Sequence, residues 1–316
     1  MKELDQLDLE QLRDGIRAID AQLVRLLGER AAYSLAVGKV KRALSEESIG
    51  NSGKAGLEGS DEKKDAEAAV FHPGREADIL RHLETLCDGP LPKAHLRAIY
   101  REILSSSRNL QRPQRVAFHG PVGSPAHLAG KNLLGSLADF HPRQSLEDVF
   151  QAVSSADCEI GIVPRETVPQ DSPHAGLALF MRYPGICILA DTATRFAIIG
   201  RTPAEAPGPE STSLLMFSLP DEADKQHPSG MAAAPTRPDT AEAARAMLCA
   251  AGLHIRKLES RPRPQESGKC MFFAEIAGNI LSSEHAGALE SVRKKCLTFR
   301  LLGCYPTLEY CTIENV

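Results

Sequence analysis

Basic side chains at regular spacing near the start of the chain are the residues best suited to chemistry. Arg30 and Lys41 are eleven residues apart, close to three helical turns, so both would project from one helix face about 16 Å apart along its axis. Two such long side chains, leaning inward, can clamp a small dianion. Arg13 precedes Arg30 by seventeen residues, about 25 Å on the same helix. It is too far to share that ligand within one chain, but it is within reach of a ligand bound by an antiparallel partner chain.

Polar residues on two later segments extend this set. Ser107 and Gln111 are spaced i and i+4, which places them on one helical face. Arg75 and Glu76 follow Pro73, a residue typical of a helix start. The set holds no nucleophile and no cluster of metal ligands. It suits a reaction that needs shape and charge stabilisation without covalent catalysis, and we expect neither a metal nor a cofactor.

The composition narrows the classes of protein to which the chain belongs. Its 316 residues include 37 Lys and Arg against 41 Asp and Glu, a net charge of −4, whereas nucleic-acid-binding proteins show a basic excess. No apolar run reaches the roughly 18 residues of a membrane span, and the acidic N-terminus does not look like a signal peptide. The eight cysteines form no CxxC pair and are typical of reduced thiols. We expect a cytoplasmic protein that binds neither nucleic acid nor membrane.

One long helix is predicted at the start of the chain. It would cover about residues 5–44 and measure roughly 60 Å, so its apolar stripe must be buried against other helices, for which a second chain is one source. Residues 45–69 are rich in Ser, Gly, Glu and Lys and are predicted to be a flexible insertion. Helices over 75–86 and 95–110 complete an all-α domain over residues 1–111. The apolar stripe of the first helix comprises Leu9, Leu12, Ile16, Ile19, Leu23, Leu26 and Leu27.

Strands and helices alternate in the rest of the chain. Over residues 115–201 this alternation predicts an α/β domain with a parallel sheet. Residues 202–210 are mostly Pro, Ala, Glu and Gly, which is typical of a linker. Residues 211–310 follow the order β-α-β-β-α-β, which predicts an α+β ferredoxin-like sandwich. Three domains are therefore expected.

Residues 1–111, apart from the insertion, resemble the all-helical chorismate mutases. In that family an intertwined dimer converts chorismate to prephenate by a Claisen rearrangement. The resemblance thus implies chorismate as substrate and a homodimer or higher homo-oligomer. The matching stretches, in order, are Leu12-Arg13-Asp14, Ile19-Asp20, Glu29-Arg30, Val37-Gly38-Lys39-Val40-Lys41, Pro73-Gly74-Arg75-Glu76 and Ser107-Arg108-Asn109-Leu110-Gln111.

The same resemblance implies a role for each polar residue. Arg30, with Arg13 of the partner chain, would hold the substrate carboxylates. Lys41 and Gln111 would face the ether oxygen, where negative charge builds as the C–O bond breaks. The remaining residues would act at the ring hydroxyl, Glu76 by binding it and Arg75 and Ser107 as supporting contacts.

Residues 115–201 resemble a prephenate dehydratase domain, whose two periplasmic-binding-protein-like lobes enclose the active site. Thr194 would be the catalytic threonine that helps expel the ring hydroxyl as prephenate becomes phenylpyruvate. Only 27 residues separate Glu166 from Thr194, where a whole lobe should intervene, so we expect a single α/β lobe. An enzyme that lacks one wall of its cleft cannot exclude water, so the expected role is that of an inactive spacer, with a surviving dehydratase as the alternative. The matching stretches run over residues 116–124, 144–150, 161–166 and 194–196.

Residues 211–310 resemble an ACT-type regulatory domain. The run Glu259, Ser260, Arg261 and Pro262 is the family's signature, and such domains bind phenylalanine at a dimer interface. The glycine that opens the first helix of the family is replaced here by Pro238-Asp239, and glycine allows a ligand to approach the backbone closely. Two roles are therefore possible for residues 211–310: an effector-binding domain, or a packing module that binds no ligand.

The three resemblances together match the bifunctional chorismate mutase/prephenate dehydratases of phenylalanine biosynthesis. They imply a chorismate mutase, an isomerase, fused to a lyase-like region that we expect to be inactive. The alternative is a non-catalytic protein that senses phenylalanine or directs assembly.

Overall fold

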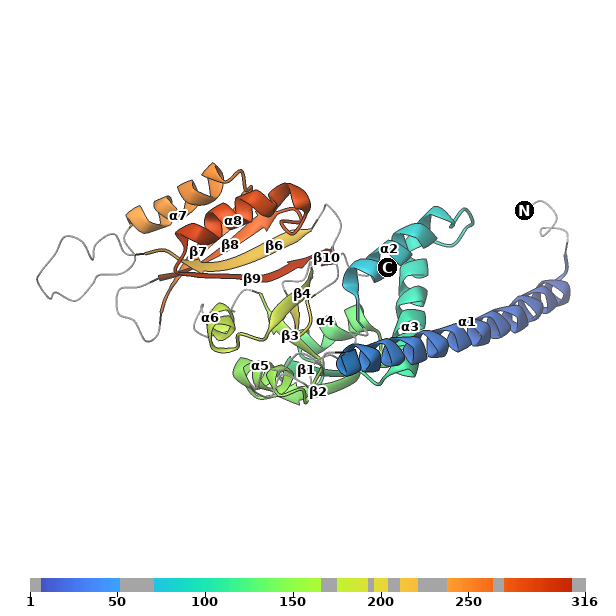
Figure 1. The fold of residues 1–316 in the computed structure, drawn as a ribbon. Helices are drawn as coiled ribbons and strands as arrows, with labels where there is room; N and C mark the ends of the chain where they lie inside the picture. Colours follow the sequence, from blue (N-terminus) through green and yellow to red (C-terminus); the bar gives the residue numbers. More distant parts are fainter. Residues whose placement is uncertain are drawn as a thin grey trace, which may run out of the picture. The chain divides into compact units, whose positions relative to one another are not determined.

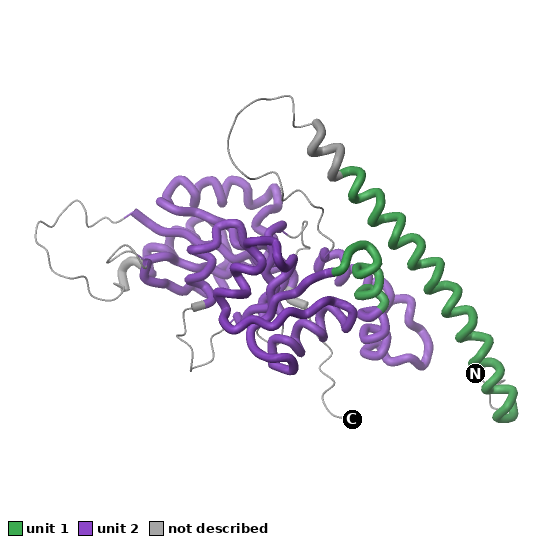
Figure 2. The backbone as a smooth tube through the Cα atoms, turned by 90° about the horizontal axis from the view of Figure 1, so that it is seen from below, with its two compact units in different colours: residues 1–70, 103–113 green, residues 71–102, 114–316 purple. Residues whose placement is uncertain are grey.

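The chain divides into two compact units in the computed structural model (Figure 2). The first comprises residues 1–70 and 103–113, and the second comprises residues 71–102 and 114–316. Among the helices of the described ranges, none combines the length and the apolarity that a bilayer span requires. The structure describes residues 7–51, 71–165, 175–192, 196–203, 211–220, 238–263 and 270–308.

Helix α1 (Leu9–Asn51) dominates the first unit. Asp8 caps it: its Oδ1 accepts from the Gln11 backbone N–H at 2.8 Å, and the Gln11 side chain accepts from the Asp8 N–H at 3.0 Å. The prediction of a flexible insertion over 45–69 is wrong for residues 45–51, which continue the helix, because the stretch before Gly50 contains no proline or glycine. Residues 52–69 lie outside the described residues.

The apolar stripe of α1 is left uncovered in a single chain. Most of its large apolar side chains between residues 9 and 44 are exposed by 42% or more of their surface, while Leu12 is half-buried, and the helix spacing puts many of them on one face. A helix with such a face is normally packed against another element. The exposed residues include Leu9, Ile16, Ile19, Leu23, Leu26, Leu27, Val37 and Leu44.

Two helices link the units along the chain. Helix α2 (Pro73–Thr85) begins at Pro73, and α3 spans Lys93–Gln111, each within two residues of the bounds predicted from the sequence. Within the second unit, the Arg97 guanidinium donates to the Glu84 carboxylate and joins α2 to α3. The last part of α3, residues 103–111, belongs to the first unit.

The α/β part of the second unit, called the lobe below, has one six-stranded sheet of order β10-β4-β5-β3-β1-β2. Strand β1 pairs in parallel with both β2 and β3, but β5 runs antiparallel to β3 and β4, so the predicted parallel sheet is in fact mixed. The elements are β1 (Arg115–His119), α4 (Pro125–Leu134), β2 (Asp139–Arg143), α5 (Leu146–Ser154), β3 (Ile160–Pro164), α6 (Ala175–Arg182), β4 (Cys187–Thr192) and β5 (Phe196–Gly200).

The C-terminal part follows the predicted β-α-β-β-α-β order. Its antiparallel sheet has the order β7-β8-β6-β9, and α7 and α8 cover one face of it (Figure 1). Leu215 and Phe217 point to these helices, while Leu214 and Met216 pack with the α/β lobe, as alternation along a strand requires. The elements are β6 (Thr212–Ser218), α7 (Pro238–Ala250), β7 (Ile255–Pro262), β8 (Cys270–Ala277), a 3₁₀ turn (Ser283–His285), α8 (Ala286–Lys295) and β9 (Thr298–Tyr305).

The two sheets of the second unit are joined by the chain itself. After β9 the backbone crosses into the lobe, where β10 (Thr307–Leu308) pairs in parallel with β4. Gly303 lies so close to β4 that a Cβ there would overlap the carbonyl oxygen of Ile188. Arg300 donates hydrogen bonds to backbone carbonyls at the end of α6, including that of Phe180 at 2.8 Å. The lobe and the C-terminal sheet therefore share one packed boundary.

Candidate active site

Arg30 and Ser107 form the centre of the candidate site in the first unit. The Arg30 Nη1 on α1 donates to the Ser107 Oγ on α3. Ser107 is only 9% exposed, and its Oγ donates in turn to the Ile103 carbonyl at 2.9 Å. Because this hydroxyl is held on both sides, it restricts the conformations open to the guanidinium. An arginine fixed in this way is suited to binding a carboxylate.

Gln111 meets α1 one helical turn further along α3. It packs against Gly38, which is buried in the helix interface. Lys41 lies on the same unbroken helix as Arg30 and is partly exposed, so the predicted common face of the two cations rests on regular helical geometry. Arg30, Ser107 and Gln111 are thus the predicted residues that the structure brings together.

The other predicted mutase residues lie away from this cluster along the chain. Arg13 is exposed on the first part of α1, about 25 Å from Arg30 by helical rise. Arg75 and Glu76 occupy the first turn of α2, in the second unit. Glu76 is the acidic residue of that first turn.

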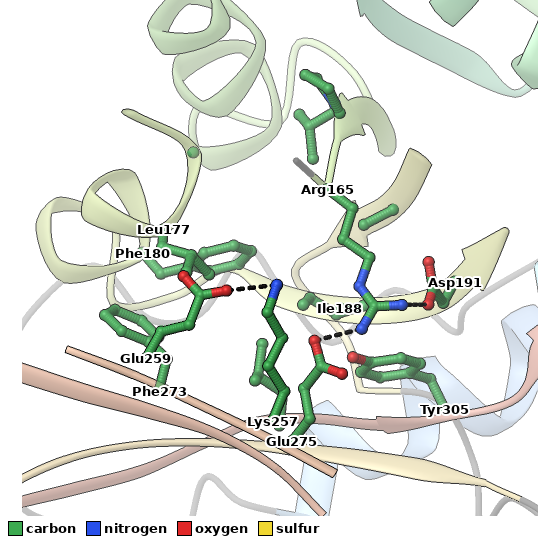
Figure 3. A pocket seen from close by; sticks show the side chains of 15 residues that line it. Arg165, Leu177, Phe180, Ile188, Asp191, Lys257, Glu259, Phe273, Glu275 and Tyr305 are labelled. Atoms are coloured by element: carbon green, nitrogen blue, oxygen red, sulfur yellow. Dashed lines mark hydrogen bonds and ion pairs between the residues drawn. The ribbon is translucent and has the colours of Figure 1, made fainter. Parts of the chain in front are cut away.

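A second candidate region is a cavity at the boundary between the lobe and the C-terminal sheet (Figure 3). Arg165, just after β3, donates to the Asp191 carboxylate on β4 and to the Glu275 carboxylate on β8. Tyr305 of β9 and Phe273 of β8 also line it. The cavity measures about 50 Å³, room for a few water molecules. Drug-sized ligands occupy pockets several times larger.

Burial controls the protonation of the groups in this cavity. It raises the pKa of Tyr305, and it raises the pKa of Asp191 although the charge of Arg165 acts in the opposite direction. Burial also disfavours the charge of Arg165, but the hydrogen bond to Glu275 and the charge of Asp191 outweigh this and raise its pKa. Arg165 therefore stays cationic, with its charge already balanced by two carboxylates.

The predicted effector residues lie on β7, at the edge of the C-terminal sheet. The Arg261 guanidinium donates to the Glu259 carboxylate and to the Ser260 carbonyl, the latter at 2.9 Å. Lys257 contacts the same carboxylate at 2.5 Å. Pro262 ends the strand. In this structure the signature residues bind one another.

The predicted dehydratase residue Thr194 lies outside the described residues, as does Glu166. Within the described residues, His127 at the start of α4 is fixed by its neighbours. Its Nδ1 accepts from the Gly123 backbone N–H at 3.0 Å, its ring stacks on Phe118 at 4.9 Å between centroids, and burial lowers its pKa.

Two features of the site are not apparent from residue types. The contact of Gly38 with Gln111 is a matter of helix packing, for which the only hint in the sequence is a glycine within an otherwise helical pattern. Arg165 binds partners 26 and 110 positions away, and no local spacing encodes such pairs. Its one signal was its position at the end of a buried strand, where parallel sheets place their ligands.

Comparison with known proteins agrees with this description. Residues 12–112 match the model of the family Chorismate mutase type II. A bifunctional chorismate mutase/prephenate dehydratase of Neisseria gonorrhoeae is 22% identical over 371 aligned positions, which cover 93% of this chain and 96% of that protein. The protein of the same description from Stutzerimonas stutzeri is 30% identical over 183 positions, covering 58% of this chain and 45% of its own.

Among solved structures, the chain is similar to the prephenate dehydratase of Streptococcus mutans. It has a TM-score of 0.49 and 22% identity, and the match covers 62% of this chain and 99% of that one. With residues 12–112 matched to that family and the Neisseria relative aligned along 93% of the chain, the chain is an enzyme with a chorismate mutase domain, related to the bifunctional chorismate mutase/prephenate dehydratases.

Proposed function

We propose that the helical residues 1–111 convert chorismate to prephenate. The observation that carries the proposal is the arginine of α1 held by a buried serine of α3, Arg30 with Ser107, beside Gln111 and on one helix with Lys41. A fixed guanidinium, an amide and an ammonium provide charge and hydrogen bonds in set positions. Electrostatic catalysis uses such groups to stabilise the charge that develops in the transition state.

The reaction needs no group beyond these. In the Claisen rearrangement one C–O bond of the ether breaks while a C–C bond forms, with the electrons moving in a ring, so that nothing is transferred to the protein. The ether oxygen gains negative charge as its bond to the ring breaks. Lys41 and Gln111 would donate to that oxygen, and an interaction that strengthens in the transition state raises kcat. Removing one such donor commonly costs a factor of about 100 to 1,000.

The remaining residues would hold the substrate in the reactive conformation. Arg30 and the partner chain's Arg13 would bind the two carboxylates, and Glu76 would accept from the ring hydroxyl. Arg75 and Ser107 would support these contacts. Fixing the two ends of a flexible ether removes conformational freedom before the reaction, an effect worth several kcal/mol in intramolecular reactions.

The same helix supports a homodimer. The stripe of exposed apolar side chains on α1 supports pairing with a second copy, because each large apolar side chain contributes about 1.5–3 kcal/mol on full burial. An antiparallel arrangement would bring Arg13 of one chain to Arg30 of the other. The site would then contain residues of both chains.

We further infer that the α/β lobe is a structural remnant with no dehydratase activity. The alignment of 371 positions with the Neisseria relative exceeds the 316 residues of this chain, so that relative has residues without a counterpart here. The cavity of about 50 Å³ at the boundary is small for prephenate, and Arg165 already balances two carboxylates there. Phenylalanine remains the effector to test on the C-terminal sheet.

The experiment is a chorismate-depletion assay of the purified chain with identification of the product. We expect prephenate to accumulate and no phenylpyruvate to form. Arg30→Ala and Lys41→Ala should each remove most of the turnover, and near-full turnover in either variant would refute the site. Formation of phenylpyruvate would refute the proposal that the α/β lobe has no dehydratase activity. Phenylalanine binding by calorimetry with no loss of chorismate would favour the alternative, a non-catalytic sensing protein.

A further inference from the structure

Helices α1 and α3 approach each other closely at Gly38. A Cβ placed on Gly38 would lie 3.1 Å from Cγ, 3.3 Å from Cβ and 3.4 Å from Cα of Gln111. Carbon atoms in ordinary contact are about 3.5–4.0 Å apart. The absence of a side chain at position 38 therefore lets Gln111 lie directly on the backbone of α1.

Two other glycines of α1, Gly15 and Gly28, have no such contact. A Cβ on Gly15 or on Gly28 would meet nothing within 4 Å among the described residues, and both positions are exposed, whereas Gly38 is buried. Glycine is a poor helix former at all three positions. Of these three glycines, only Gly38 occupies a place where a side chain would collide with α3.

A larger residue at position 38 would displace the end of the Gln111 side chain. One of the three close atoms belongs to the α3 backbone, so either α3 shifts by a few tenths of an ångström or the Gln111 side chain changes its rotamer. Both movements carry the amide, which lies beyond Cγ, away from its present place. Electrostatic catalysis depends on such positions, since a shift of about 1 Å can cost a factor of 100 in rate.

We propose that Gly38 is a positioning residue for the mutase reaction, which sets the place of the Gln111 amide by allowing α1 and α3 to approach. The inference rests on the proposed function, because it assigns the amide its task at the ether oxygen. It differs from a purely structural role in one respect. The effect of residue 38 on turnover passes through Gln111.

The test compares Gly38→Ala with Gly28→Ala in the full-length chain. Gly28 is two residues from Arg30, on roughly the opposite face of the helix, and alanine there brings the same gain in helix propensity without a contact. We expect G38A to lower kcat about tenfold with KM for chorismate changed less than twofold, because the amide acts on the transition state and the arginines bind the carboxylates. G28A should keep both constants.

The second arm repeats G38A in a Gln111→Ala background, where Cγ and the amide are gone. There G38A should change kcat by less than twofold, since coupled residues are not additive. An equal loss of kcat in both backgrounds, or equal kcat in G38A and G28A, would overturn the proposal. If G38A does not fold, the double variant G38A/Q111A should fold, because the Gln111 side chain beyond Cβ is gone. A double variant that also does not fold would overturn the proposal. A wild-type chain without chorismate turnover would instead refute the proposed function.

Discussion

Removing the Arg165 guanidinium should strongly destabilise the second unit. Asp191 is 3% exposed and Glu275 is 16% exposed at the side chain, and both are bound by this one cation. Arg165→Met would leave two carboxylates close together with their main partner gone. Breaking a buried pair costs about 3–5 kcal/mol, and we expect about 3 kcal/mol here because Arg165 itself keeps a third of its surface exposed.

Urea denaturation followed by circular dichroism measures this loss. The matched control is Arg182→Met, whose partner Glu147 lies 2.7 Å away with both side chains about half exposed, so that a change below about 1 kcal/mol is expected. The triple variant R165M/D191N/E275Q removes all three charges and should recover most of the stability, since the loss comes from uncompensated charge. A loss in R165M no larger than in R182M, or a triple variant less stable than R165M, would refute the reasoning.

Three further predictions concern individual contacts. Ser107→Ala should lower kcat/KM for chorismate about 10- to 100-fold, because a hydrogen bond to a charged group contributes about 1.5–3 kcal/mol to holding Arg30; unchanged kinetics would contradict it. Gly303→Ala should cost about 2–4 kcal/mol in urea denaturation through overlap with the Ile188 carbonyl, whereas Gly185→Ala, with nothing within 4 Å in the described residues, should cost less than about 1 kcal/mol. The hydrogen bond from Arg97 lowers the pKa of Glu84 below its ordinary value of 4.5, so the pair stabilises the fold above that value and loses its effect as the pH falls through the lowered pKa. The free energy of unfolding should therefore fall less steeply below pH 4.5 in Glu84→Gln than in the wild type.

Periodicity predicted the helices and most strands, and it failed where tertiary structure decides. Strand β2 (Asp139–Arg143) was not predicted, because Pro142 and the polar residues around it do not alternate; the strand lies at the edge of its sheet, where proline is tolerated. The short β10 exists only because β4 offers a partner edge. Helix α6 (Ala175–Arg182) is mostly apolar, and so short a run has no clear helical period.

In the candidate site, too, spacing along the chain predicts some contacts, and tertiary packing decides the others. The positions of Arg30, Ser107 and Gln111 follow from spacing along two helices, and the structure brings these three residues together. The partners of Arg165 do not follow, since they are set by how one sheet packs on another. The place of Arg13 in a partner chain's site stays a prediction, because it depends on an assembly and not on a single chain.

Mixing two inactive variants tests most directly whether each site is built from two chains. Arg13→Ala and Arg30→Ala are each expected to be inactive as homodimers. When they are unfolded together and refolded, half of the dimers contain one chain of each kind, and one of the two sites in each mixed dimer has both arginines. The account predicts recovery of about a quarter of wild-type turnover on mixing. A mixture as inactive as its components would contradict it.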